Sequence, residues 1–190
     1  MKTGLIPRIS LGVAVVALLL VIKGPVAMAQ KADSAEISNL LSEAQHHAVL
    51  LDDDAVTLQS YTRSKLHWKS HAQQLELMKT HVNNLGKVTA QLSDLRSEGS
   101  PWQQQAIDQI NPLLQEMADH LTATINHLNE NQERVNMPAF QDYARANYDL
   151  ASKTSALIKD YVNYDKARSQ SQSLEQKLEM PVENEGNASE

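Results

Sequence analysis

The chain has 190 residues, with 17 Lys and Arg side chains against 23 Asp and Glu, so its formal net charge is −6 at pH 7. This length suits a single domain, and the acidic excess argues against nucleic acid and anionic lipid as partners, because Lys and Arg provide most contacts to both. The sequence contains no cysteine, which excludes disulfides, thiolate zinc sites, iron–sulfur clusters and cysteine nucleophiles.

The first 29 residues have the pattern of a secretory signal peptide. Lys2 and Arg8 give a positive start, residues 9–22 are an apolar run, and Ala27 to Ala29 form a small-residue cleavage site. The run is 14 residues long, shorter than the ~20 that a membrane-spanning helix needs. We therefore expect cleavage after Ala29 and a secreted or periplasmic mature chain that is not an integral membrane protein.

Cleavage makes the mature chain more acidic. Three basic residues leave with the signal, so 14 basic side chains face 23 acidic ones and the net charge becomes −9. The last residues, 181–190, are rich in Glu and poor in apolar groups, which predicts a disordered acidic tail. Residues 30–180 remain as one folded domain.

That domain has few helix breakers. Between residues 30 and 180 the chain contains two glycines and three prolines, too few for the turns of an all-β fold. Apolar residues recur with the seven-residue spacing of helical bundles. In the first predicted helix they are Ile37, Leu41, Ala44, Ala48, Leu51, Ala55 and Leu58. The pattern predicts an all-α protein.

Caps and prolines place the helix boundaries. Ser100-Pro101 begins one helix, with Gln103 at the position of a capping box. Asn111-Pro112 predicts a kink or a restart within that helix, and Pro138 begins the last one. We expect an antiparallel up-down-up-down four-helix bundle, because short links join neighbouring helices; its helices lie near 34–60, 68–97, 101–135 and 138–178.

Seven histidines are an unusual feature of the composition. A fold-back near residue 64 places His47 level with His81. A second fold-back, near Gly99, places His81 level with His120. These three histidines form the first candidate site for copper, zinc or nickel, the metals that suit imidazole. His67 and His71 are four residues apart and therefore share a helical face. Together with His127 they form a second candidate group of metal ligands.

The histidines also have plainer interpretations. On the flank of a bundle helix they can simply hydrogen-bond to backbone or to a carboxylate, or they can make the surface pH-sensitive. Asp52, Asp53 and Asp54 are consecutive, so on a helix they point about 100° apart and cannot converge on one ion. We expect these carboxylates to form a solvated face.

Catalytic motifs are missing. A di-iron bundle needs two Glu-x-x-His motifs, and Glu43 to His46 is the single example. Phosphate-cradling glycine loops and nucleophile turns do not occur.

The sequence therefore favours an exported, non-catalytic binding or interaction module of the periplasm or cell envelope that uses no cofactor. Its partner would be a protein, an envelope component or a second copy of the chain. The alternatives are a histidine-rich bundle that binds copper, zinc or nickel and, less favoured, an oxidoreductase with a cofactor in the bundle core. Four tyrosines on the last helix either pack internally or line an aromatic groove for a partner helix: Tyr143, Tyr148, Tyr161 and Tyr164.

Overall fold

Four long helices form the fold. The computed structural model describes residues 31–179 and contains α1 (Ala35–Tyr61), α2 (Trp68–Asp94), α3 (Pro101–Glu130) and α4 (Pro138–Glu179), with short 3-10 turns η1 (Arg96–Glu98) and η2 (Gln132–Arg134) in the two later connections. The predicted fold class is confirmed. The signal-peptide and acidic-tail predictions lie outside the described residues.

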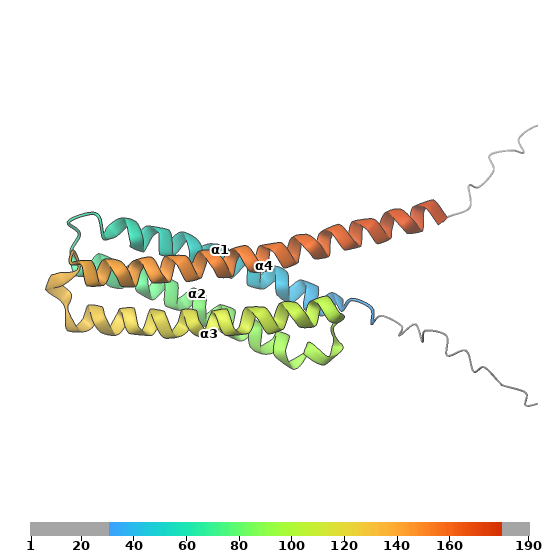
Figure 1. Cartoon of the computed structure of the whole chain (residues 1–190), viewed down its shortest axis with the longest axis horizontal. Helices are drawn as coiled ribbons and strands as arrows, with labels where there is room; N and C mark the ends of the chain where they lie inside the picture. Colours follow the sequence, from blue (N-terminus) through green and yellow to red (C-terminus); the bar gives the residue numbers. More distant parts are fainter. Residues whose placement is uncertain (1–30, 180–190) are drawn as a thin grey trace, which may run out of the picture.

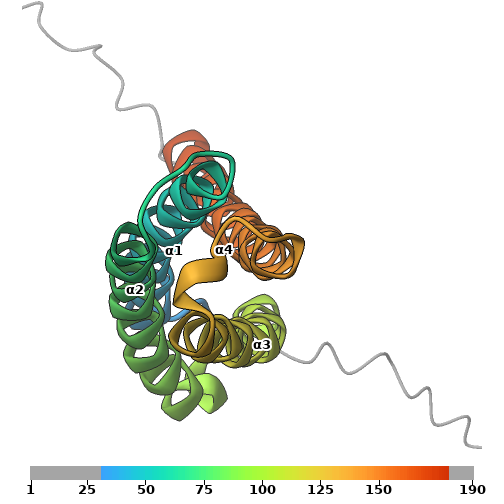
Figure 2. The same ribbon diagram turned by 90° about the vertical axis from the view of Figure 1, so that its left-hand side faces the viewer.

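The helices run alternately up and down, and each packs against its neighbours in the chain (Figure 1). α4 returns to lie beside α1, so the bundle closes into a ring of four when seen end-on (Figure 2). α1 therefore touches α2 on one flank and α4 on the other. This order of neighbours decides which side chains can meet.

The core is a continuous apolar seam. Each helix presents buried side chains at three- and four-residue intervals, which places them on one face. The α1 positions predicted from the sequence are all fully buried. Each large apolar side chain removed from water stabilises the fold by about 1.5–3 kcal/mol, so burial along this seam holds the cysteine-free domain together.

Two helices end earlier than the sequence predicted. α2 stops at Asp94 rather than near 97, because the backbone tightens into η1 before Gly99. α3 stops at Glu130 rather than near 135, because Asn131 adopts φ −132° and ψ 39° and leaves the helical conformation. In both places the loss is about one turn, taken up by 3-10 geometry.

α3 continues through Pro112 without the restart that the Asn111-Pro112 pair suggested. The proline ring removes one helical N–H. Beside it, the Asn111 side chain donates a hydrogen bond of 2.9 Å to Ser93 Oγ on α2. The hydrogen bond from Asn111 thus joins α3 to α2 next to Pro112, and α3 remains continuous there.

Gln103 ties the start of α1 to the start of α3. Its side chain is fully buried, and its Oε1 accepts hydrogen bonds from the backbone N–H groups of Ser34 (2.9 Å) and Ser100 (3.1 Å). Its Nε2 donates to the Ser34 carbonyl at 2.8 Å. One amide thus serves as the capping-box residue predicted for α3 and as a bridge to α1.

No helix within residues 31–179 is both long enough and apolar enough to cross a membrane.

We predict that Gln103→Ala lowers the free energy of unfolding by about 2–4 kcal/mol, because it leaves the backbone N–H groups of half-buried Ser34 and buried Ser100 without an acceptor. The nearby and exposed Gln105 provides a matched control, and Gln105→Ala should change stability by less than about 0.5 kcal/mol. Urea denaturation followed by circular dichroism measures both. Equal effects of the two substitutions would refute the bridging role of Gln103.

Candidate functional site

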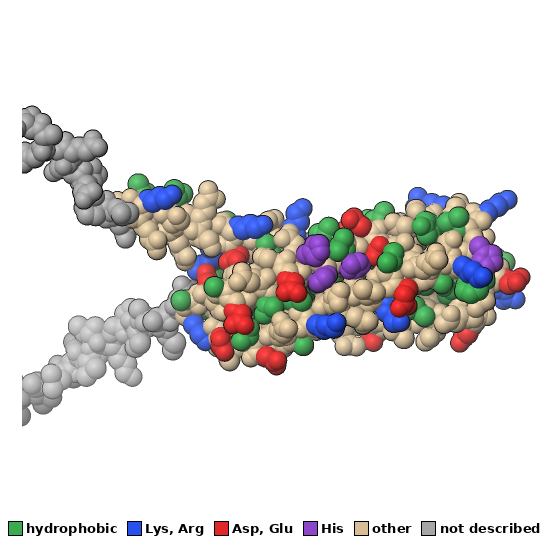
Figure 3. All heavy atoms as spheres, turned by 180° about the vertical axis from the view of Figure 1, so that it is seen from behind, with side chains coloured by type: hydrophobic (Ala, Val, Ile, Leu, Met, Phe, Trp, Pro, Cys, Tyr) green, Lys and Arg blue, Asp and Glu red, His purple; other side chains and the backbone are tan. Residues whose placement is uncertain are grey.

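The most chemically distinctive part of the surface lies between α1 and α2. His46, His47 and Asp54 of α1 gather there with His81 of α2, and we call these four residues the α1–α2 histidine cluster. Figure 3 shows histidine side chains grouped on one face of the molecule. The level pairing of His47 with His81, predicted from the fold-back near residue 64, is confirmed.

Distances within the cluster are short. The ring centroids of His47 and His81 are 6.1 Å apart, and those of His46 and His47 are 5.3 Å apart. Nε2 of His81 lies 3.5 Å from Oδ2 of Asp54, with each side chain less than one-fifth exposed. The cluster therefore combines imidazole nitrogens and a carboxylate oxygen in half-buried positions between α1 and α2.

Several polar atoms of the cluster are buried without a hydrogen-bond partner. They are Nδ1 of His47, Nδ1 of His81 and Oδ2 of Asp54. A buried polar atom that makes no hydrogen bond costs about 1–3 kcal/mol. These unpaired atoms distinguish the cluster from an ordinary solvated surface, where water satisfies each group.

Burial also changes the protonation of His47. It lowers the pKa of His47 below the usual 6.5, and the neighbouring imidazoles lower it further, while Glu43 acts in the opposite direction. The neutral ring, with a free nitrogen lone pair, is therefore favoured near neutral pH.

Asp54 was not predicted to contribute. Of the three consecutive aspartates, only Asp53 is exposed, whereas Asp52 and Asp54 are half-buried, so the expected solvated face is wrong for two of them. Asp54 follows His47 by seven residues, which puts both side chains on the same flank of α1. That spacing could have identified Asp54 from the sequence.

His120, the third member of the first predicted metal group, faces another neighbour. It lines a shallow pocket with Ala139, Asp142, Tyr143 and Ala146 of α4. α2 turns the flank that carries His81 toward α1, and its other flank faces α3. The structure therefore brings His47 and His81 together and places His120 against α4.

The second predicted group is separated by an aromatic ring. His71 is fully buried and meets Phe140 edge-on at 5.3 Å between ring centroids. His127 stacks on the same Phe140 at 6.3 Å and contacts Tyr143 at 4.8 Å. His67 is used elsewhere, because its Nδ1 caps α2 by accepting a hydrogen bond from the Lys69 N–H.

Within residues 31–179, no three His, Asp or Glu side chains already stand together in positions that could hold a metal ion.

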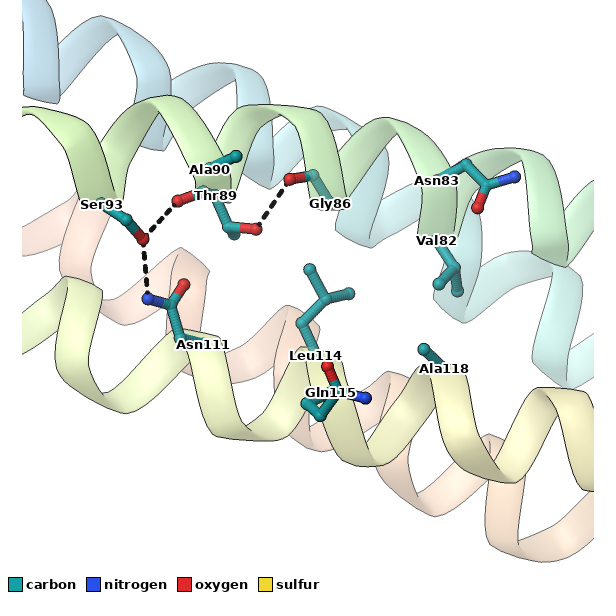
Figure 4. Close-up of a pocket in the computed structure, with 10 residues that line it drawn as sticks. All are labelled: Val82, Asn83, Gly86, Thr89, Ala90, Ser93, Asn111, Leu114, Gln115 and Ala118. Atoms are coloured by element: carbon teal, nitrogen blue, oxygen red, sulfur yellow. Dashed lines mark hydrogen bonds between the residues drawn. The ribbon is translucent and has the colours of Figure 1, made fainter.

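A groove of about 400 Å³ lies between α2 and α3 (Figure 4). Small residues open it, and a Cβ atom added to Gly86 would meet no atom within 4 Å. Thr89 and Ser93 donate their hydroxyl hydrogen bonds to backbone carbonyls of α2. None of its ten lining residues is titratable, so the groove contains no group for acid–base catalysis.

A second surface feature is the end of α4. Asp33 accepts hydrogen bonds from Trp102 Nε1 (2.6 Å) and Arg168 Nε (3.0 Å). Beyond Arg168, every residue from 169 to 178 is exposed, and Figure 1 shows α4 running past the start of α1. These residues, with Leu174 52 % and Leu178 85 % exposed, form what we call the protruding end of α4.

An apolar groove lies at the base of the protruding end. Its volume is about 370 Å³, and its lining includes Trp102 of α3 with Leu157, Tyr161 and Tyr164 of α4. Trp102 and Tyr164 meet edge-on at 5.3 Å between ring centroids. Tyr161 and Tyr164 thus border a groove, and Tyr161 also packs against the core.

The chain matches no known protein-family model, no curated protein and no solved structure.

We predict that the stability of the domain falls as the pH drops below about 6.5 and that His71 is one cause. Burial is the main effect that lowers the pKa of His71 below 6.5, and the nearby backbone carbonyls of His67 and Tyr61 act in the opposite direction. The unfolded state then binds a proton that the folded state does not, so this contribution is complete above pH 6.5 and is lost below it.

Urea unfolding measured between about pH 5.5 and 7.5 tests this prediction, with a slope of at most about 1.4 kcal/mol per pH unit for each such group. His71→Leu should flatten the dependence, leaving the part that His47 contributes. Parallel curves for the two proteins would contradict the role of His71.

Proposed function

We propose that the mature chain is an exported helical-bundle protein of the periplasm or cell envelope that acts by binding a partner rather than by catalysis. The protruding end of α4 is the observation that carries the proposal. It extends by about 15 Å at 1.5 Å per residue, and nothing within residues 31–178 covers its leucines.

The proposed occupant is an amphipathic helix of a second chain. A helix end without tertiary contacts keeps only its intrinsic stability, so packing a partner against Leu174 and Leu178 would stabilise it. The apolar groove at its base offers Trp102, Tyr161 and Tyr164, and Trp and Tyr are the aromatic residues that anchor protein interfaces. A partner helix lying in this groove would contact these aromatic side chains through apolar residues spaced three and four apart in its own sequence.

Export makes a separate prediction. Protein recovered from the periplasmic fraction should begin at Gln30, as measured by intact mass, because signal peptidase reads the small residues that end at Ala29. A chain that keeps Met1 and remains in the cytoplasm would contradict the proposed location.

The partner role predicts that Leu174→Ser and Leu178→Ser together leave the unfolding temperature unchanged but weaken association by about tenfold or more. Leu77 provides a matched control, because it is 51 % exposed on α2 while Leu174 is 52 % exposed on α4. A photo-crosslinker placed at 174 or at 77 first identifies the partner in its own compartment, and the purified pair then gives the dissociation constants.

Specific crosslinking from 174, with binding lost in the Leu174/Leu178 variant and kept in Leu77→Ser, supports the proposal. A crosslink to another copy of this chain identifies the partner helix as its own, and sedimentation of the purified protein then measures the affinity. Equal crosslinking from both positions would overturn the assignment of the protruding end.

A further inference from the structure

We propose that the α1–α2 histidine cluster is a binding site for one divalent transition-metal ion, with Asp54 Oδ2, His81 Nε2 and His47 as its protein ligands. The site is independent of the protruding end of α4. It also differs from the group that the sequence suggested, because a carboxylate of α1 replaces His120 of α3.

The first two ligands already stand at a suitable separation. Bonds of about 2.0–2.2 Å from a tetrahedral ion to nitrogen and oxygen place two ligand atoms about 3.3–3.5 Å apart. His81 Nε2 and Asp54 Oδ2 are 3.5 Å apart. This separation is long for a hydrogen bond between nitrogen and oxygen, and Oδ2 has no hydrogen-bond partner. An ion between the two atoms would satisfy both.

Gln74 fixes the orientation of the carboxylate. Its Nε2 donates a hydrogen bond of 2.8 Å to Asp54 Oδ1 and another of 3.1 Å to the Asp54 carbonyl. One carboxylate oxygen is therefore occupied, and the other is left facing His81. Metal ligands are commonly oriented by such hydrogen bonds from neighbouring side chains.

His47 is the third ligand and has to turn to reach the ion. Two imidazoles on one tetrahedral ion have ring centroids about 5 Å apart, whereas those of His47 and His81 are 6.1 Å apart. A side-chain rotation that moves the ring by about 1 Å closes this difference. Nδ1 of His47 is buried without a hydrogen-bond partner, so coordination to an ion would also supply this nitrogen with a partner.

Two imidazoles and one carboxylate select borderline transition metals such as Zn²⁺, Cu²⁺ or Ni²⁺. The site opens to solvent, because the side chains of His81 and Asp54 keep 19 % and 18 % of their exposure. An ion can therefore enter from the surface and complete its coordination with water. The surrounding carboxylates give the mature chain a negative charge that favours cations.

Titration of the metal-free mature chain, residues 30–190, with Zn²⁺ in a calorimeter at about pH 7.5 tests the site, because protons compete with metal for imidazole at lower pH. We expect one ion per chain. Asp54→Asn should weaken binding by about tenfold or more, and its shape preserves the fold. His81→Ala and His47→Ala should weaken it similarly.

His120→Ala is the matched control. His120 lies against α4, so its substitution should leave the affinity for Zn²⁺ unchanged. A second measurement guards against variants that bind poorly because they are unfolded: Zn²⁺ should raise the unfolding temperature of the wild type and of His120→Ala but not that of Asp54→Asn. Absence of saturable binding by the wild type, or equal losses in His120→Ala and His81→Ala, would overturn the proposal.

Discussion

Burial of one apolar seam holds this protein together, and every other feature depends on it. The chain has no cysteine, so the four helices are stabilised by packing and by the few polar bridges at their ends. Buried alanines on α1, such as Ala44, Ala48 and Ala55, are small and take little room in the seam. The seam leaves each helix two flanks, and each flank meets a different neighbour.

Polar residues of this protein differ in how deeply they are buried and in whether their atoms have hydrogen-bond partners. Gln103 is fully buried and saturated by backbone groups, so it serves the fold. His71 is equally buried, yet its Nε2 has no partner, and burial lowers the pKa of its ring. In the α1–α2 histidine cluster, the atoms without a hydrogen-bond partner belong to several residues, and the side chains of His81 and Asp54 are partly exposed to solvent. An arrangement that costs folding energy and remains accessible is typical of a binding site rather than of a structural bridge.

The two proposed binding features lie on different parts of the molecule and use different physics. The protruding end of α4 offers apolar and aromatic surface to another helix, which would be recognised by shape and burial. The α1–α2 histidine cluster offers nitrogen and oxygen lone pairs to a metal ion, and the type and geometry of these ligands would select the ion. Because they share no residue, each can be tested while the other stays intact. Together, the two proposals would give a cysteine-free bundle two routes to act by binding.

The sequence alone determined the helices, their order and the apolar seam, because helix periodicity, proline caps and turn positions are local properties of the chain. It also placed His47 level with His81, since a short connection fixes the register of neighbouring antiparallel helices. Only the tertiary structure decided that His120 faces α4, that Asp54 lies beside His81 and that α4 extends beyond the bundle. These depend on which flank of each helix meets which neighbour, and a seven-residue pattern identifies the buried face without saying what lies beside it.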